Sequence, residues 1–181
     1  MFVFLDIGAH IGESADFWKK HYPESYVICF EPLPENCKKI REKKYKVIQA
    51  AAWIRNEKIK FYTGLPQSGS LYASKITGGI NPKKYIEVQG IDVAEYIKKY
   101  FTKSDTIVIK MNCEGAEYNI IPHLRKYHLI EWVDAFYVQW HYGKIGVSKQ
   151  THDKIAGMIK SSRWRAMFPQ AFEREFQKIN Y

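Results

Sequence analysis

The sequence has few cysteines, no long apolar run and no long charged arm. Its 181 residues hold three cysteines at irregular spacing, without a CxxC pair, which favours neither a disulfide framework nor a zinc site. Cys29 and Cys113 lie in apolar runs, as expected of small core residues in a reducing compartment. The apolar start at residues 1–5 meets Asp6 at once, too soon for a signal peptide or a membrane span. We therefore expect a soluble, cytoplasmic protein without a metal site.

The charge balance is basic, with a formal net charge of +9. Lysines come mainly as pairs within mixed stretches, and no Arg-rich arm is present. Such pairs are typical of solvated surfaces, although a basic chain also suits nucleic acid, anionic lipid or an acidic substrate. The length fits one domain over residues 1–181, either as a complete protein or as part of a longer one. The sequence does not indicate an oligomeric state.

Short apolar runs alternate with amphipathic stretches along the chain. Strands are predicted at Phe2–Ile7, Tyr26–Phe30, 46–52, 58–63, 85–88, Thr106–Met111 and 132–140. Helices are predicted at Glu13–His21, 34–44, Val93–Tyr100, 116–126 and 151–160. Residues 64–82 read as a long loop, and 164–168 with 172–178 as a closing hairpin. The alternation predicts an α/β fold with a mostly parallel sheet and helices on both faces.

A glycine turn follows the first predicted strand. In a parallel sheet, ligands bind beyond the carboxyl ends of the strands, so residues after each strand are the candidates for a site. Here Gly8 and Gly12 enclose a tight turn that leads into a helix. Glycine lets the backbone approach a ligand, and the helix amides point towards it. The G-x-x-x-G spacing differs from the dinucleotide fingerprint, which disfavours a nicotinamide-dependent oxidoreductase.

Glu31 closes the second predicted strand, 25 positions after Asp6. A carboxylate there can accept hydrogen bonds from both hydroxyls of a ribose. A glycine turn with an acidic strand end indicates an adenosine-containing ligand. Polar residues also follow the strands at 110–117 and 139–143, where each set taken alone is equally explained by cap or turn chemistry.

Taken together, these stretches resemble the FkbM-type methyltransferase family. The matching residues are Phe-Leu-Asp-Ile-Gly-Ala-His-Ile-Gly-Glu-Ser at 4–14, Phe-Glu-Pro-Leu-Pro-Glu-Asn at 30–36 and Ile-Lys-Met-Asn-Cys-Glu-Gly-Ala-Glu-Tyr at 109–118. Gly-Ile-Asp-Val at 90–93 and Gln-Trp-His at 139–141 are weaker matches. The resemblance implies a Rossmann-like class I methyltransferase fold with a mostly parallel seven-stranded sheet. It also implies S-adenosylmethionine as cofactor and methylation of a hydroxyl on a sugar or another small molecule.

The chain departs from the family pattern at two positions. Asn112 stands where the family usually has Asp, and Gln139 where it has Glu. Both changes remove a negative charge, which argues against a metal site and moves the catalytic base elsewhere. The chain also starts at its first strand, so a cover over the cofactor would come from residues 64–82 or from a partner.

Ten residues are expected to bind the cofactor. The methionine portion is expected to lie among Asp6, Gly8, Ala9, His10, Gly12 and Ser14. We expect Glu31 to bind the ribose, Pro32 and Ala51 to flank the adenine, and Ser70 to lie in the loop above the cofactor. His10 is equally explained as an exposed turn residue.

Three residues are expected to act in catalysis and three to contact the acceptor. His141 is the first candidate for the base, because imidazole titrates near neutral pH, and Glu114 is the second. Asn112 can orient the acceptor but cannot take its proton. The expected substrate contacts are Lys110, Trp140 and Tyr142.

The sequence is also compatible with two other functions. The net charge would suit a nucleic-acid methyltransferase, although no Asn-Pro-Pro-Tyr or Asp-Pro-Pro-Tyr motif is present. The changes at Asn112 and Gln139 would suit a degenerate methyltransferase fold that serves as a binding module.

Overall fold

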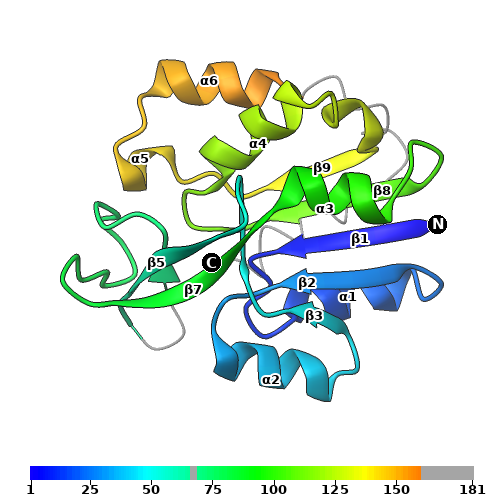
Figure 1. Cartoon of the computed structure of the whole chain (residues 1–181), viewed down its shortest axis with the longest axis horizontal. Helices are drawn as coiled ribbons and strands as arrows, with labels where there is room; N and C mark the ends of the chain where they lie inside the picture. Colours follow the sequence, from blue (N-terminus) through cyan, green and yellow to red (C-terminus); the bar gives the residue numbers. More distant parts are fainter. Residues whose placement is uncertain (66–68, 160–181) are drawn as a thin grey trace.

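The computed structural model describes residues 1–65 and 69–159, and its larger sheet has five parallel strands (Figure 1). The strand order is β3-β2-β1-β8-β9, and all four neighbouring pairs run parallel. The chain leaves β1 towards β2 on one side and returns to β8 on the other, so the order reverses at β1. The strands are β1 (Phe2–Ile7), β2 (Tyr26–Phe30), β3 (Lys46–Ile48), β8 (Thr106–Met111) and β9 (Ala135–Val138).

Both faces of this sheet are buried, because side chains along the central strands alternate between two hydrophobic clusters. Val3 and Leu5 of β1 belong to the cluster under α3, α4 and α6. Phe4 belongs to the opposite cluster, where the indole of Trp18 stacks on its ring with centroids 4.4 Å apart. The helices are α1 (Glu13–His21) and α2 (Pro34–Glu42) on the Phe4 face, and α3 (Val93–Tyr100), α4 (Glu117–Lys126) and α6 (Lys149–Gly157) on the other.

A second sheet of four strands has the order β4-β7-β5-β6. We expected one seven-stranded sheet, but in the described part of the chain the strands divide into sheets of five and four. The division begins at Gln49 and Ala50, inside the single strand predicted over 46–52. The Ala50 N–H donates to the Ile48 carbonyl at 2.8 Å, and this turn separates β3 from a strand of the second sheet. The strands are β4 (Ala51–Trp53), β5 (Glu57–Thr63), β6 (Gly69–Ser70) and β7 (Tyr85–Asp92).

Most of the remaining predicted elements are confirmed, and β1, α1, β2, α3 and β8 have the predicted bounds. The aromatic run 132–140 is not one strand, because only β9 is extended between the short helices η1 (Ile130–Trp132) and α5 (Tyr142–Ile145). The predicted loop 64–82 contains β6. The hairpin predicted at 164–168 and 172–178 lies outside the described residues. Across 1–65 and 69–159, no helix combines the length and the apolar character that a membrane span requires.

Asp92 is the N-cap residue of α3. Its carboxylate accepts hydrogen bonds from the backbone N–H groups of Ala94 and Glu95, and so caps the helix. The same carboxylate contacts Nε2 of His123 on α4 at 2.9 Å. The Gly-Ile-Asp-Val stretch therefore joins the second sheet to the helices above the first.

Candidate functional site

The carboxyl ends of β1, β2 and β8 surround a cavity of about 370 Å³. Its walls come from the loops that follow these strands, from Ala51 and Ala52 of β4, and from Phe61, Gly69 and Leu71 of the second sheet and its loop. The cavity therefore lies at the reversal of strand order, where open α/β sheets bind ligands.

Gly8 begins the loop on one side of the cavity and has a φ of 74°. A Cβ atom at this position would lie 2.0 Å from the Asn112 carbonyl oxygen, so the space next to the β8 loop admits only glycine. The N–H groups of Gly8 and Ala9 donate to the Phe30 carbonyl at 3.0 and 3.1 Å. These contacts fix the glycine turn against both neighbouring strands.

Glu31 is a buried carboxylate in the wall of the cavity, only 5% exposed. Its Oε2 accepts a hydrogen bond from the His10 N–H at 2.9 Å, and its Oε1 accepts from the Leu33 N–H at 2.9 Å and from Nδ2 of Asn36 at 3.3 Å. Burial raises the pKa of the Glu31 carboxyl to about 7, against the opposing effect of these donors. Burial thus destabilises the ionised carboxylate, and a ligand that donates hydrogen bonds to its two oxygens would stabilise it.

Asp6 and Lys110 form a buried ion pair beneath the glycine turn. Nζ of Lys110 lies 2.9 Å from Oδ1 of Asp6 and donates to the Gly8 carbonyl at 2.8 Å. The two residues are neighbours in the register of β1 and β8, and their side chains are 0% and 2% exposed. The pair holds the turn in place, so Asp6 supports the cavity from below. Lys110 lines the cavity, but its ammonium is engaged by Asp6 and Gly8.

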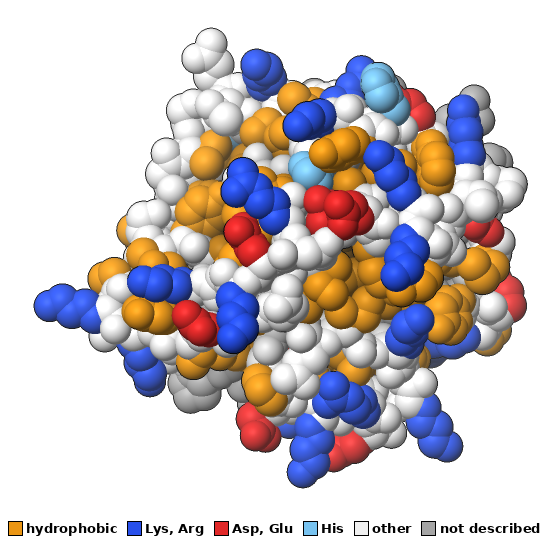
Figure 2. All heavy atoms as spheres, in the orientation of Figure 1, with side chains coloured by type: hydrophobic (Ala, Val, Ile, Leu, Met, Phe, Trp, Pro, Cys, Tyr) orange, Lys and Arg blue, Asp and Glu red, His pale blue; other side chains and the backbone are white. Residues whose placement is uncertain are grey.

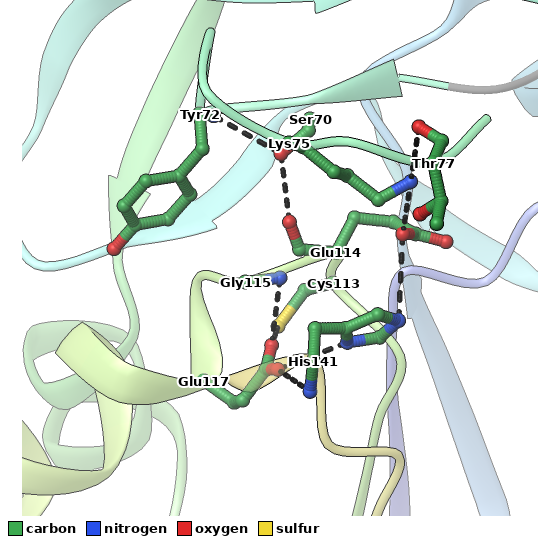
Figure 3. Close-up of polar contacts among 9 residues, drawn as sticks. All are labelled: Ser70, Tyr72, Lys75, Thr77, Cys113, Glu114, Gly115, Glu117 and His141. Carbon is green, nitrogen blue, oxygen red and sulfur yellow. Dashed lines mark hydrogen bonds and ion pairs between the residues drawn. The ribbon is translucent and has the colours of Figure 1, made fainter. Parts of the chain in front are cut away.

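Glu114 lines the cavity beyond β8 and connects it to a chain of charged side chains (Figure 3). Its Oε2 lies 2.7 Å from Nζ of Lys75 and 3.4 Å from Nε2 of His141. On the other side of the imidazole, Nδ1 lies 2.9 Å from Oε1 of Glu117. Glu117 also accepts hydrogen bonds from the backbone N–H groups of His141 and Gly115, each at 2.9 Å. The imidazole is thereby held between two carboxylates.

The structure brings ten of the sixteen predicted site residues into the cavity lining. Of the other six, Asp6 lies beneath the glycine turn, Gly12 is the N-cap residue of α1 with a φ of 82°, and Ser70 donates through Oγ to the Glu114 carbonyl at 2.7 Å. His141 is 1% exposed and reaches the cavity only through Glu114. The ten lining residues are Gly8, Ala9, His10, Ser14, Glu31, Pro32, Ala51, Lys110, Asn112 and Glu114.

Trp140 and Tyr142, expected to contact the acceptor, lie in an aromatic cluster around His152 of α6. The Tyr142 ring stacks on the His152 ring with centroids 4.5 Å apart, and Trp140 meets it edge-on at 4.9 Å. The hydroxyl of Tyr118 on α4 lies 2.9 Å from Nδ1 of His152. These contacts join α4, α5 and α6, and neither Trp140 nor Tyr142 lines the cavity.

Lys75, Glu117, Phe61 and Leu71 also contribute to the site but were not predicted to do so. Glu117 lies three positions after Glu114 at the start of a helix, a spacing that could have indicated a shared partner. Lys75 lies in a long loop without a motif, and no sequence signal identifies it. Within residues 1–65 and 69–159, no three His, Cys, Asp or Glu side chains are grouped so as to hold a metal ion.

Comparison with known proteins gives one match. A family model described as Methyltransferase FkbM domain matches residues 6–161. No curated protein and no solved structure shows a significant match. The matched range covers most of the chain and includes the glycine turn, Glu31, Glu114 and His141. The chain therefore belongs to the FkbM methyltransferase family, and it is a methyltransferase.

Proposed function

We propose that the cavity binds S-adenosylmethionine and that the enzyme transfers its methyl group to a hydroxyl of a carbohydrate or another small molecule. The observation that carries this proposal is the buried Glu31 carboxylate, which lines the cavity beside the glycine turn. A carboxylate in this position suits the two hydroxyl donors of a ribose. The tight fit at Gly8 supports the same site, because it holds the glycine turn against the β8 loop, where the His10 N–H donates to Glu31 at 2.9 Å.

The walls of the cavity fit the other parts of this cofactor. Ala51, Ala52, Phe61 and Leu71 provide apolar surface close to Glu31, which suits an adenine ring. Ser14 also lines the cavity, from the first turn of α1 at the positive end of the helix dipole, which suits a carboxylate. When bound, S-adenosylmethionine supplies an electrophilic methyl group on a sulfonium.

The residues beyond β8 suit the acceptor end of the site. Asn112 and Glu114 line the cavity there, and an amide and a carboxylate can orient a hydroxyl group. Alignment of the reacting groups contributes most to such a displacement, and a positioned base adds about a hundredfold to ten-thousandfold. Because His141 is buried behind Glu114, we place Glu114 next to the acceptor hydroxyl and His141 behind it as a support.

The charge distribution on the face drawn in Figure 2 does not favour a nucleic acid as acceptor. Lysine and arginine side chains lie both within this face and along its edge, where they are interspersed with acidic and apolar ones. Proteins that follow a phosphate backbone gather such charges into a patch or stripe. An acceptor of low charge, such as a sugar, suits this face better.

The test is transfer of an isotopically labelled methyl group from S-adenosylmethionine to a panel of monosaccharides and oligosaccharides, with a polynucleotide arm for comparison. We expect a labelled methyl ether on a sugar, reduced about a hundredfold or more by Glu114→Gln. Glu35→Gln is the matched control, because that side chain is exposed on α2. Label on the polynucleotide alone, or on an amine, would contradict the proposed acceptor.

A further inference from the structure

Lys75 is a buried lysine that belongs to the second sheet's loop rather than to the family motifs. It lies between β6 and β7, and its side chain is 4% exposed. Its ammonium contacts Oε2 of Glu114 at 2.7 Å and donates to the Thr77 carbonyl at 3.2 Å. A buried ammonium requires a counter-ion, and among the described residues Glu114 is the only carboxylate in contact with Lys75.

Glu114 is held in place from three directions. Its backbone has a φ of 54°, and Oγ of Ser70 donates to its carbonyl at 2.7 Å. Its Oε2 meets both Lys75 and Nε2 of His141, whereas Oε1 has no hydrogen-bond or ion-pair partner in residues 1–65 and 69–159 (Figure 3). The side chain is 33% exposed and lines the cavity. One carboxylate oxygen is thus anchored, and the other is available to a ligand.

The other charged groups nearby cannot replace Lys75 as a counter-ion. Lys110 also lines the cavity, but its ammonium is engaged by Asp6 at 2.9 Å and by the Gly8 carbonyl. Nδ1 of His141 faces Glu117, a second carboxylate, at 2.9 Å. Without Lys75, two carboxylates would share one imidazole at this end of the cavity, and Glu114 would present an unbalanced negative charge.

We propose that Lys75 is a specificity-determining residue of the cofactor site: it balances the charge of Glu114 and so limits the preference of the cavity for a cationic ligand. This inference rests on the proposed function. S-Adenosylmethionine carries a positive sulfonium, whereas S-adenosylhomocysteine is a neutral thioether. A bare carboxylate would favour the cationic reactant, whose charge disappears during transfer, and such ground-state binding does not accelerate the reaction. With Lys75 in place, Glu114 keeps a free oxygen for the acceptor without this excess attraction.

The experiment is calorimetric titration of both ligands into the wild type, Lys75→Met, Glu114→Gln and the double variant. The readout is the ratio of the two dissociation constants, which expresses the preference for the cationic ligand. We expect Lys75→Met to raise this preference about fivefold or more, and Glu114→Gln to lower it by a similar factor. The double variant should return to within about twofold of the wild type, because it removes one charge of each sign and the two opposite shifts cancel.

Matched variants separate charge from structure. Lys75→Arg keeps the charge and should keep the wild-type ratio, and Lys83→Met removes an exposed lysine from the same segment. A Lys75 that only anchors its loop would change both affinities equally, and an unchanged ratio in Lys75→Met and Glu114→Gln would overturn the inference. If Lys75→Met does not fold, Lys75→Gln removes the same charge while keeping hydrogen-bond donors for Glu114 and the Thr77 carbonyl, and should raise the preference in the same direction. Absence of binding of either ligand to the wild type would instead contradict the proposed function.

Discussion

Glu31 gives the protein a pH dependence of stability with a sign that is unusual for a carboxylate. Burial raises the pKa of this carboxyl from 4.5 to about 7 in the folded state. Between these values the folded state binds more protons than the unfolded chain, so the free energy of unfolding falls as the pH rises. At about 1.4 kcal/mol per pKa unit, the loss approaches about 3 kcal/mol above neutral pH.

The variant Glu31→Gln removes this dependence, because its amide does not ionise. The amide also fails to accept from one of the two backbone N–H groups that Glu31 binds, at a cost of about 1–3 kcal/mol that is independent of pH. The informative quantity is therefore the difference in the free energy of unfolding between variant and wild type, and how this difference changes with pH. Urea unfolding followed by tryptophan fluorescence, at about pH 5 and about pH 8, should shift this difference by about 2–3 kcal/mol in favour of the variant at the higher pH.

The exposed Glu35 on α2 provides the control, and its replacement by Gln should shift the same difference by less than about 0.5 kcal/mol. A shift for Glu31→Gln of less than about 1 kcal/mol, or one that favours the wild type at the higher pH, would refute the reasoning. Either result would mean that the pKa of the Glu31 carboxyl is not raised in the folded state, so that burial does not dominate the environment of this carboxylate.

Three further substitutions or reactions test other parts of the site. Lys110→Met should lower the free energy of unfolding by about 3–5 kcal/mol in urea titrations, because it leaves the Asp6 carboxylate buried without its counter-ion. The added substitution Asp6→Asn should recover part of this loss, and an absence of recovery would contradict the ion pair. Gly8→Ala should cost about 2 kcal/mol or more and abolish cofactor binding, whereas Gly143→Ala, where a Cβ meets nothing within 4 Å, should change little. Burial raises the pKa of the Cys37 thiol to about 11 and that of the Cys29 thiol well above its usual value. A disulfide reagent at about pH 8 should therefore modify these two thiols only on unfolding, and rapid modification of either one in the native protein would contradict their burial.

The parallel sheet could be predicted from sequence because its strands are buried on both faces. Such strands are continuous apolar runs, as in Phe2–Ile7 and Thr106–Met111, and their ends are marked by glycine turns or polar residues. The cavity lining followed from the same rule, since a ligand site lies where these strands end. Eight of the ten predicted residues that line it follow β1, β2 or β8.

The remaining features depend on contacts between distant parts of the chain. Nothing local in the run 46–52 indicates that Ala50 turns the backbone from one sheet into the other. Lys75 meets Glu114 only because the second sheet's loop folds over the end of β8. Trp140 and Tyr142 were predicted to contact the acceptor from their position after a strand, whereas packing against His152 directs them to α6. Sequence position identified the edge of the sheet but not the direction of each side chain.

The most direct test of the proposed cofactor is calorimetric titration of S-adenosylmethionine into the wild type and Glu31→Ala at about pH 8. We expect micromolar binding to the wild type, weakened at least about tenfold in the variant, because the ribose hydroxyls lose their buried acceptor. Wild-type binding that persists unchanged in Glu31→Ala would contradict the placement of the ribose. Absence of binding to a folded wild type would contradict the cofactor itself.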